Sequence, residues 1–147
     1  MDVLTPEQRH RCMAMIKGRD TKPEVLLRKA LFSLGLRYRL HQKRLPGTPD
    51  IVFPKYHAVV FIHGCFWHGH SCRLFVVPKT NKEFWVRKIA GNRSRDEHAV
   101  ALLQTMGWRV MTVWECAVRG EEKVPLEVLA TSIRRWLNSK KSLGELP

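Results

Sequence analysis

The stretch DIVFPKYHAVVFIH, residues 50–63, decides the fold. It contains two apolar runs, 51–53 and 58–62, on either side of the short segment PKYH. Such runs joined by a short turn predict two antiparallel strands, and the second run, apolar throughout, predicts a strand buried at the centre of a sheet. The start of the first strand then lies beside the end of the second, so we expect Asp50 and His63 to lie close together.

Helix and strand patterns continue on both sides of this pair. Capping boxes such as Thr21 with Glu24, and glycines such as Gly35, mark the expected helix ends. In chain order the expected elements are a helix over 6–17, a helix over about 22–34, a strand over 36–41, the two strands above, a helical region over about 80–106 interrupted near Gly91, a strand over 108–115, a helix over about 125–138 and a frayed tail over 140–147. A helix between the third and fourth strands makes these strands parallel. The sequence therefore predicts one domain over 1–147 of the α/β class, a mixed β-sheet flanked by α-helices.

The composition indicates a folded protein that binds a polyanion. Hydrophobic residues make up 44% of the 147, and 26 lysines and arginines against 13 acids give a net charge of +13. Neutralised phosphates release their counterions, so this charge favours a nucleic acid over a merely basic, soluble surface. The longest apolar run, 58–62, is too short to span a bilayer, and MDVLTPEQRH at the start lacks a signal-peptide core, so we expect a soluble intracellular protein with no membrane partner.

A second stretch, HGCFWHGHSC (63–72), holds three histidines and two cysteines. Cys116 follows the last strand, and with Cys65 and Cys72 it makes an odd set of thiols that one histidine would complete. Three sulfurs and one nitrogen form a closed tetrahedral zinc site, which is structural because no position remains for water. The spacing leaves the nitrogen ligand open among three residues: His63, His68 and His70. The alternative is ordinary buried thiols, which is what we expect of Cys12 in the first helix.

Asp50 is the candidate catalytic acid. A carboxylate, two histidines left over from the zinc and a large positive charge suit metal-assisted hydrolysis of a phosphodiester. The carboxylate would bind a hard cation such as Mg²⁺, and a histidine would take a proton from water. Alternatively, Asp50 only begins its strand after a turn and Glu24 only completes a capping box, although Glu24 could both cap and contact a water around the metal.

The large aromatic residues fall into two kinds. Phe66 and Trp67 are adjacent in a loop between polar residues, and Trp85 lies near a helix start beside basic residues. Exposed aromatics beside a nuclease site can stack on bases or wedge between them, and the alternative is that they pack over the zinc. The remaining tryptophans share one face of a strand or fit a helix face, which predicts core packing for Trp108, Trp114 and Trp136.

Four segments together resemble one protein family, the very short patch repair (Vsr) endonucleases. The segments are LPGTPD (45–50), HGCFWHGHSC (63–72), EFW (83–85) and GWRVMTVWEC (107–116), and the resemblance extends from about residue 8 to 120. It implies a restriction-endonuclease-like fold, a variant of the PD-(D/E)xK nucleases. It also implies an enzyme that nicks DNA 5′ of the thymine in a T·G mismatch, which arises when 5-methylcytosine deaminates, so that short-patch repair can begin.

The resemblance also implies a role for each site residue. Asp50 and the main-chain carbonyl of Ile62 would hold Mg²⁺, with the acid Glu24 behind them. His68 would be the general base, and His63 its partner near the scissile phosphate. The zinc ligands would be Cys65, His70, Cys72 and Cys116. The DNA-binding residues would be Phe66, Trp67 and Trp85, which intercalate, Asn92, which makes a further contact, and an N-terminal helix within 1–20, which covers the opposite groove.

Two positions depart from the family pattern. Gly69 stands between His68 and His70, where many members have consecutive histidines. Ile62 stands where a threonine is familiar. A main-chain ligand tolerates isoleucine at this position, whereas a hydroxyl ligand would not.

The expected partner is double-stranded DNA that contains a T·G mismatch, with mismatch-repair proteins as further partners of a monomer in the bacterial cytoplasm. Two other functions compete with mismatch nicking. One is a restriction-type endonuclease that cuts both strands, and the other is a non-catalytic, zinc-stabilised DNA-binding module. A zinc deaminase is disfavoured, because the sequence lacks His-x-Glu with a downstream Pro-Cys-x-x-Cys.

Overall fold

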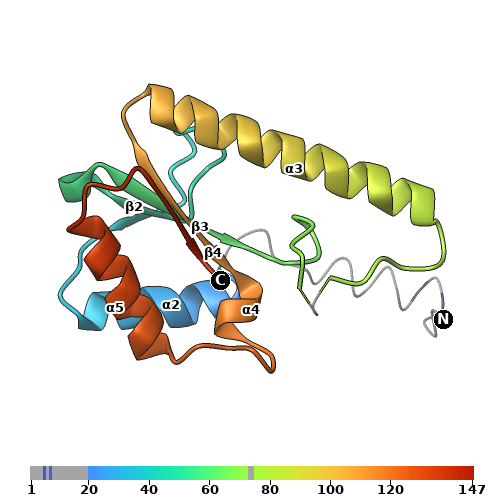
Figure 1. The fold of residues 1–147 in the computed structure, drawn as a ribbon, viewed down its shortest axis with the longest axis horizontal. Helices are drawn as coiled ribbons and strands as arrows, with labels where there is room; N and C mark the ends of the chain where they lie inside the picture. The colour runs from blue at the N-terminus through green and yellow to red at the C-terminus, as the bar shows by residue number, and fades with distance from the viewer. Residues whose placement is uncertain (1–4, 6, 8–19, 73–74) are drawn as a thin grey trace.

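The computed structural model describes residues 5, 7, 20–72 and 75–147. Nearly all of the helix predicted over 6–17 lies outside them, as does Cys12. The described chain forms three layers (Figure 1): one helix covers one face of a sheet, and two helices cover the other face. The single helix is α3 (Lys82–Thr105), and the pair is α2 (Lys22–Ser33) and α5 (Leu126–Leu137). The predicted mixed sheet with flanking helices is therefore confirmed.

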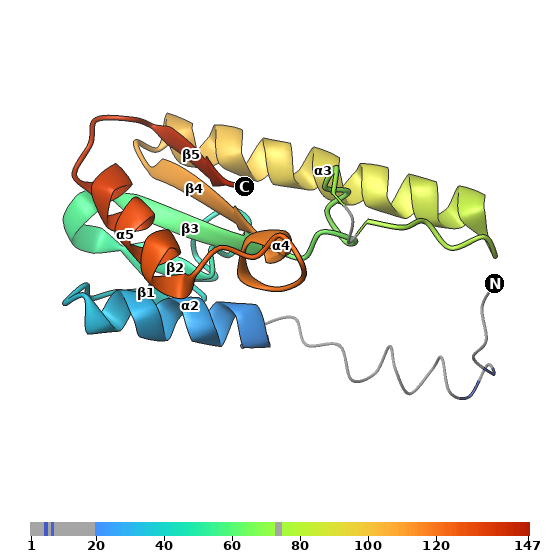
Figure 2. The ribbon, with the colours of Figure 1, turned by 60° about the horizontal axis from the view of Figure 1, so that its bottom comes forward.

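The sheet has five strands within the described residues, in the order β1-β2-β3-β4-β5 (Figure 2). They are β1 (Arg39–Leu40), β2 (Ile51–Phe53), β3 (Ala58–His63), β4 (Arg109–Trp114) and β5 (Leu143–Leu146). The first three pair antiparallel, and β4 pairs parallel with both β3 and β5. The predicted hairpin and parallel crossover are confirmed. The first strand is shorter than the predicted 36–41, because its pairing ends at Leu40 and His41 turns the chain at φ 47°.

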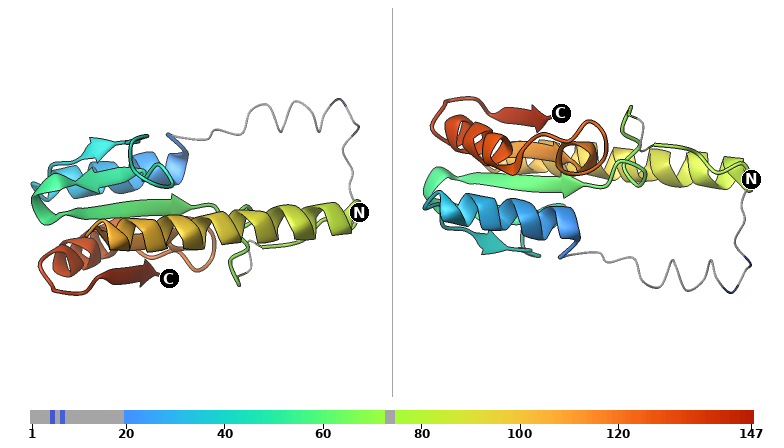
Figure 3. Two further views of the ribbon diagram at one scale, coloured as in Figure 1. Left: turned by 90° about the horizontal axis from the view of Figure 1, so that it is seen from above. Right: turned by 90° about the horizontal axis from the view of Figure 1, so that it is seen from below.

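Helix α3 runs without a break for 24 residues, so the predicted interruption near Gly91 is wrong. A glycine in a helix interior costs about 1 kcal/mol relative to alanine, which does not end a helix that is packed on both sides of it. Ile89 and Ala99 provide that packing, since both are buried. The N-terminal half of α3 extends beyond the carboxyl ends of β3 and β4 (Figure 3). Among the described helices, none combines the length and apolar character that crossing a bilayer requires.

The C-terminal residues form a strand, so the predicted frayed tail over 140–147 is wrong in its main part. β5 pairs with β4 along its whole length. The guanidinium of Arg109 lies over the Trp136 ring, 4.6 Å from its centroid. The same guanidinium donates hydrogen bonds to four main-chain carbonyls at the end of α5 and in the segment after it, those of Trp136, Leu137, Ser139 and Lys141. These tertiary contacts hold a segment whose local sequence, LGEL, has little strand character.

The two faces of the sheet carry separate hydrophobic clusters, and this separation positions the site. The larger cluster packs α2 and α5 on the sheet and includes Trp136, as predicted. The smaller cluster packs Leu103 of α3 on Phe61 of β3. Side chains alternate along a strand, so His63, two residues after Phe61, lies on the α3 face. Ile62 between them packs into the larger cluster on the opposite face.

Candidate active site and metal centre

The loop after β3 is one helical turn closed by a Schellman motif, which is a helix end completed by a left-handed residue. Three main-chain N–H groups, those of His68, Gly69 and His70, donate at 2.9–3.3 Å to the carbonyls of Gly64, Phe66 and Cys65, respectively. Gly69 supplies the left-handed residue, with φ 64°, and a Cβ there would lie 2.8 Å from Ile89 Cγ2. The motif sends His68 and His70 into different groups, although one residue separates them.

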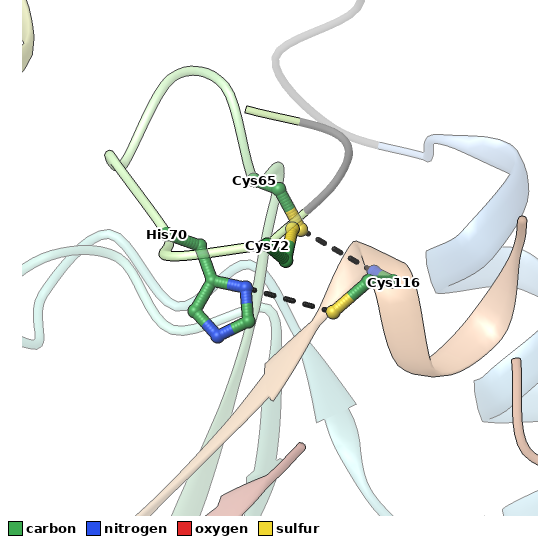
Figure 4. A group of neighbouring side chains, drawn as sticks. All are labelled: Cys65, His70, Cys72 and Cys116. Atoms are coloured by element: carbon green, nitrogen blue, oxygen red, sulfur yellow. Dashed lines mark hydrogen bonds between the residues drawn. The ribbon is translucent and has the colours of Figure 1, made fainter. Parts of the chain in front are cut away.

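Cys65, His70, Cys72 and Cys116 form the first group, and their ligand atoms all lie within 4.8 Å of one another (Figure 4). The Cys116 Sγ lies 3.5 Å from His70 Nδ1, and the Cys116 N–H donates to Cys65 Sγ at 3.3 Å. Cys116 belongs to α4 (Glu115–Val118), which follows β4 directly, so the group joins the loop to the sheet. Three sulfurs and one imidazole nitrogen suit zinc. Burial raises the pKa of the Cys65 and Cys116 thiols, and a bound cation would favour their thiolates.

Trp114 lies between this group and the remaining histidines. Its ring stacks on His70 with centroids 4.1 Å apart, and it meets His63 edge-on at 5.4 Å. The indole N–H donates to Glu145 Oε1 of β5 at 2.6 Å. The prediction that Trp114 packs in the hydrophobic core is therefore wrong. Trp108, by contrast, packs against the cluster under α3 as predicted.

His63, His68 and Asp96 form a second group, again with ligand atoms within 4.8 Å of one another. The two imidazole rings stack at 3.9 Å, and His68 Nδ1 lies 2.5 Å from Asp96 Oδ2. The pKa of His63 is lowered to about 4. Burial is the largest cause and the charge of His68 adds to it, while the charge of Asp96 opposes both. Asp96 was not foreseen from the sequence. The local signal is an acid on a helix in which basic residues outnumber acidic ones, and the exposed Glu97 shares it.

Asp50 lies just before β2 and beside the end of β3, as expected from the hairpin. Its Oδ2 accepts a hydrogen bond from the Ile62 N–H at 2.7 Å. The pKa of Asp50 is raised to about 8, mainly by burial. The hydrogen bond from the Ile62 N–H opposes this rise, and the nearby Glu24 carboxyl adds to it. Without a cation this acid therefore holds its proton near neutral pH. A divalent cation would displace that proton, which fits a metal ligand.

Glu24 is almost completely buried, with 2% of its surface exposed, and lies behind Asp50. The Thr21 hydroxyl accepts the Glu24 N–H at 3.4 Å, as a helix cap should. The Glu24 carboxylate binds His41 Nε2 at 2.8 Å and Arg28 at 3.0 Å, and it also accepts the Asp20 N–H. Glu24 thus combines capping with a buried contact to the site. Arg28 contacts the carboxylates of both Asp20 and Glu24, so a side chain of the protein already balances part of their negative charge.

A pocket of about 570 Å³ collects the groups that could act on a phosphodiester. Its walls include Asp50, Ile62, His63, His68 and Asp96. Two cations of the chain also line it, Lys43 and Arg95. The pocket therefore holds a cation ligand, an imidazole with a carboxylate partner, and positive charge for an anionic substrate.

Three aromatic rings named from the sequence pack against one another beside this pocket. The centroid distances are 5.1 Å for Phe66–Trp67, 5.4 Å for Phe66–Trp85 and 5.9 Å for Trp67–Trp85. Phe75 adjoins Phe66 at 6.4 Å. The side-chain amide of Asn92 donates to the Trp67 carbonyl at 2.8 Å. Trp114 stacks on His70 of the cysteine group, whereas these three rings contact one another as a cluster.

Comparison with known proteins gives consistent matches. The family described as "DNA mismatch endonuclease Vsr" matches residues 1–74. The DNA mismatch endonuclease Vsr of Escherichia coli (strain K12) is 46% identical over 136 residues, covering 92% of this chain and 87% of that protein. The type II nicking enzyme V.XorIIP of Xanthomonas oryzae pv. oryzae is 50% identical over 78% of this chain and 85% of its own length. The type II nicking enzyme V.NmeAIP of Neisseria meningitidis is 48% identical over 82% of this chain and 86% of its own.

Proposed function

The chain belongs to the Vsr family of DNA mismatch endonucleases, and on this premise we propose that it nicks one DNA strand 5′ of the thymine in a T·G mismatch. The observation that carries the proposal is one pocket in which Asp50, His63 and His68 meet beside the aromatic cluster. A T·G pair left by deamination of 5-methylcytosine would then be opened for short-patch repair. Relatives named as nicking enzymes favour a nick over a double-strand cut.

Mg²⁺ is the proposed catalytic cation, held by the Asp50 carboxylate and the main-chain carbonyl of Ile62. The N–H and C=O of one strand residue point to the same side, and the Ile62 N–H already points at Asp50. Ile62 also lies beyond the last residue pair of the β2–β3 ladder, Ile51 with Val60. Bound there, Mg²⁺ would supply polarisation of the phosphate. Isoleucine suits this position, since its side chain packs against the larger hydrophobic cluster and a main-chain ligand needs no hydroxyl.

His68 is the proposed general base, and Asp96 is the residue that positions it. A carboxylate that accepts from Nδ1–H leaves the lone pair on Nε2, which can take a proton from water. Asp96 would then stabilise the imidazolium that forms. His63, with its pKa lowered to about 4, stays neutral at neutral pH and does not oppose that charge. The buried Glu24 would hold Asp50 and His41 in place behind the cation.

Zinc is the proposed structural metal, held by Cys65, His70, Cys72 and Cys116. All four positions of a tetrahedral ion would be filled by protein, so the ion would stabilise the fold and leave catalysis to the neighbouring pocket. Its effect would be to fix the loop 64–72 on the carboxyl end of β4. Because His68 belongs to the same loop, zinc would also fix the position of the proposed general base.

DNA recognition is proposed to rest on the aromatic cluster, with Phe66, Trp67 and Trp85 inserted beside the mismatched pair and Asn92 as a contact at the same place. Aromatic side chains wedged between base steps kink the duplex, and a mismatch lowers the free energy needed for unstacking. We place the N-terminal helix within 1–20 in the opposite groove. The proposal includes a single restriction-endonuclease-like domain over 1–147, acting as a monomer in the bacterial cytoplasm with mismatch-repair proteins as partners.

The test compares T·G and T·A duplexes, each incubated with the purified protein with and without Mg²⁺. We expect a nick only on the T·G duplex with Mg²⁺, and no nick with Asp50→Ala. Equal cleavage of both duplexes would reject mismatch specificity. Product that falls apart on a native gel would identify a restriction-type enzyme instead. Binding without cleavage under any divalent cation would identify a DNA-binding module.

A further inference from the structure

One turn of α3 contacts two consecutive residues of the loop 64–72. Trp67 belongs to the aromatic cluster, and His68 is the proposed general base. Asn92 donates to the Trp67 carbonyl at 2.8 Å, and Asp96 binds His68 Nδ1 at 2.5 Å. Asn92 and Asp96 are four residues apart, so they lie on the same face of the helix. The aromatic cluster and the general base are therefore fixed by one rigid element.

Arg95 lies on this turn, and the proposed mechanism leaves it without a role. It lines the pocket together with Asp50, His63 and His68, yet it is an exposed residue. Its guanidinium donates to the side-chain oxygen of Asn92. Within the described part of the chain, no carboxylate lies within ion-pair distance of that guanidinium. A neutral amide on an exposed helix surface holds a guanidinium only weakly, so Arg95 can leave Asn92 for a stronger acceptor.

The charges in the pocket indicate that this stronger acceptor is a phosphate of the substrate. Asp96 is engaged with His68, and Asp50 would be neutralised by its cation. A phosphate attacked by water gains negative charge, so the pocket needs a positive group that can face two oxygens. Guanidinium matches phosphate oxygens with two parallel hydrogen bonds, whereas Lys43 on the pocket wall is a point charge.

We propose that Arg95 binds the phosphate that is cleaved. In the free protein, before DNA binds, the Arg95 guanidinium is hydrogen-bonded to the Asn92 side chain instead. This inference rests on the proposed function, since it names a group for the same reaction. The Asn92 side chain also bonds the Trp67 carbonyl, so a shift of the aromatic residue during insertion would reach the phosphate-binding residue through one amide. The competing explanation is a helix-surface hydrogen bond between Arg95 and Asn92 with no contact to DNA.

The decisive experiment is a binding cycle that requires no cleavage. Wild-type protein and Arg95→Gln are each titrated, without Mg²⁺, with a T·G duplex carrying either the natural phosphate or an uncharged methylphosphonate 5′ of the thymine. We expect the methylphosphonate to weaken wild-type binding by ~10-fold and variant binding by less than ~2-fold. Equal weakening of both proteins would overturn the contact, as would a wild-type protein that does not distinguish the two duplexes.

A kinetic arm separates this inference from the proposed function. Arg95→Gln is expected to lower the single-turnover nicking rate by ~10²–10³-fold, and Arg95→Lys to recover part of it. Arg93→Gln is the matched control, because Arg93 is an exposed arginine of the same helix that lines a different pocket, and its rate should stay within ~3-fold of wild type. A rate for Arg95→Gln within that range would overturn the inference. Wild-type protein that nicks paired DNA equally would reject mismatch specificity but leave the binding cycle to decide on Arg95.

Discussion

His63 and His68 stack with their ring centroids 3.9 Å apart and their planes 5° apart. Two rings this close cannot both carry a proton without strong repulsion. The surroundings of the two rings differ: burial lowers the pKa of His63 to about 4, while Nδ1 of His68 contacts the Asp96 carboxylate. The pair therefore has one ring suited to accept a proton and one that remains neutral.

Asp96→Asn should lower the nicking rate without weakening DNA binding. An asparagine can turn its NH₂ towards Nδ1, which favours the tautomer with a proton on Nε2 and removes the lone pair that a base needs. We expect the single-turnover rate to fall by ~10²–10⁴-fold, with Kd for the T·G duplex within ~3-fold of wild type. Glu97→Gln is the matched control, since Glu97 neighbours Asp96 but lies outside the catalytic pocket. Equal rates for the two variants would contradict the role given to Asp96.

Asp50→Asn should stabilise the metal-free protein as pH rises while abolishing nicking. The pKa of Asp50 is raised to about 8 in the folded state from 3.8, so the favourable contribution of the protonated acid is complete below about 3.8 and is lost as pH rises towards 8. Asparagine keeps the acceptor for the Ile62 N–H and has no charge to bury. At pH 8 to 9 we expect the variant to be more stable by about 1–3 kcal/mol in urea unfolding.

Two controls frame the Asp50 result. The stability difference between Asp50→Asn and wild type should shrink at about pH 5, where the wild-type acid is protonated in the fold. Mg²⁺ should raise the Tm of the wild-type protein and leave that of the variant unchanged, because only the carboxylate binds the cation strongly. A stability difference that is constant with pH would show that Asp50 is ionised in the metal-free fold.

His70→Ala should lose zinc, whereas His68→Ala should keep it. The two histidines are separated by one residue, but His70 Nδ1 lies 3.5 Å from Cys116 Sγ and His68 Nδ1 lies 2.5 Å from Asp96. We expect a zinc content near one per chain for wild type and His68→Ala, measured by elemental analysis after dialysis. His70→Ala should also unfold at a lower temperature, since metal binding contributes to folding. Full zinc content in His70→Ala would transfer the ligand role to another side chain.

Local periodicity predicted the parts of the site that lie on regular elements. The apolar run before His63 marks β3 as central, and the short turn before it brings Asp50 to the end of that strand. Strand alternation then puts His63 on the face covered by α3. The odd number of clustered cysteines suggested a histidine as a fourth ligand, and His70 is the one beside them.

Tertiary contacts account for what the sequence did not reveal. Asp96 meets His68 across 28 positions of sequence, and its own helix gives no pattern that distinguishes it from Glu97. Trp114 shares a strand face with Val110, which predicted core packing, yet its ring lies over His70 because the strand runs past the end of the cluster. β5 forms because it pairs with β4, whose Arg109 also holds the segment between α5 and β5, and β4 is distant from β5 in the chain.

Gly69→Ala should destabilise the protein more than Gly35→Ala does. Both glycines have positive φ, 64° and 87°, so both alanines incur the left-handed strain of about 1–2 kcal/mol. A Cβ at Gly35 would meet nothing within 4 Å, whereas one at Gly69 would lie 2.8 Å from Ile89 Cγ2 and 2.9 Å from Arg93 Cδ. Overlap of this kind typically costs about 1–3 kcal/mol more, so the loss at Gly69 should be about 2–5 kcal/mol in zinc-saturated buffer. Because the Schellman motif directs His68 and His70 apart, Gly69→Ala should also weaken zinc binding and slow nicking, and Gly35→Ala should do neither. Equal losses of stability for the two variants would show that the loop absorbs the methyl group by shifting away from α3.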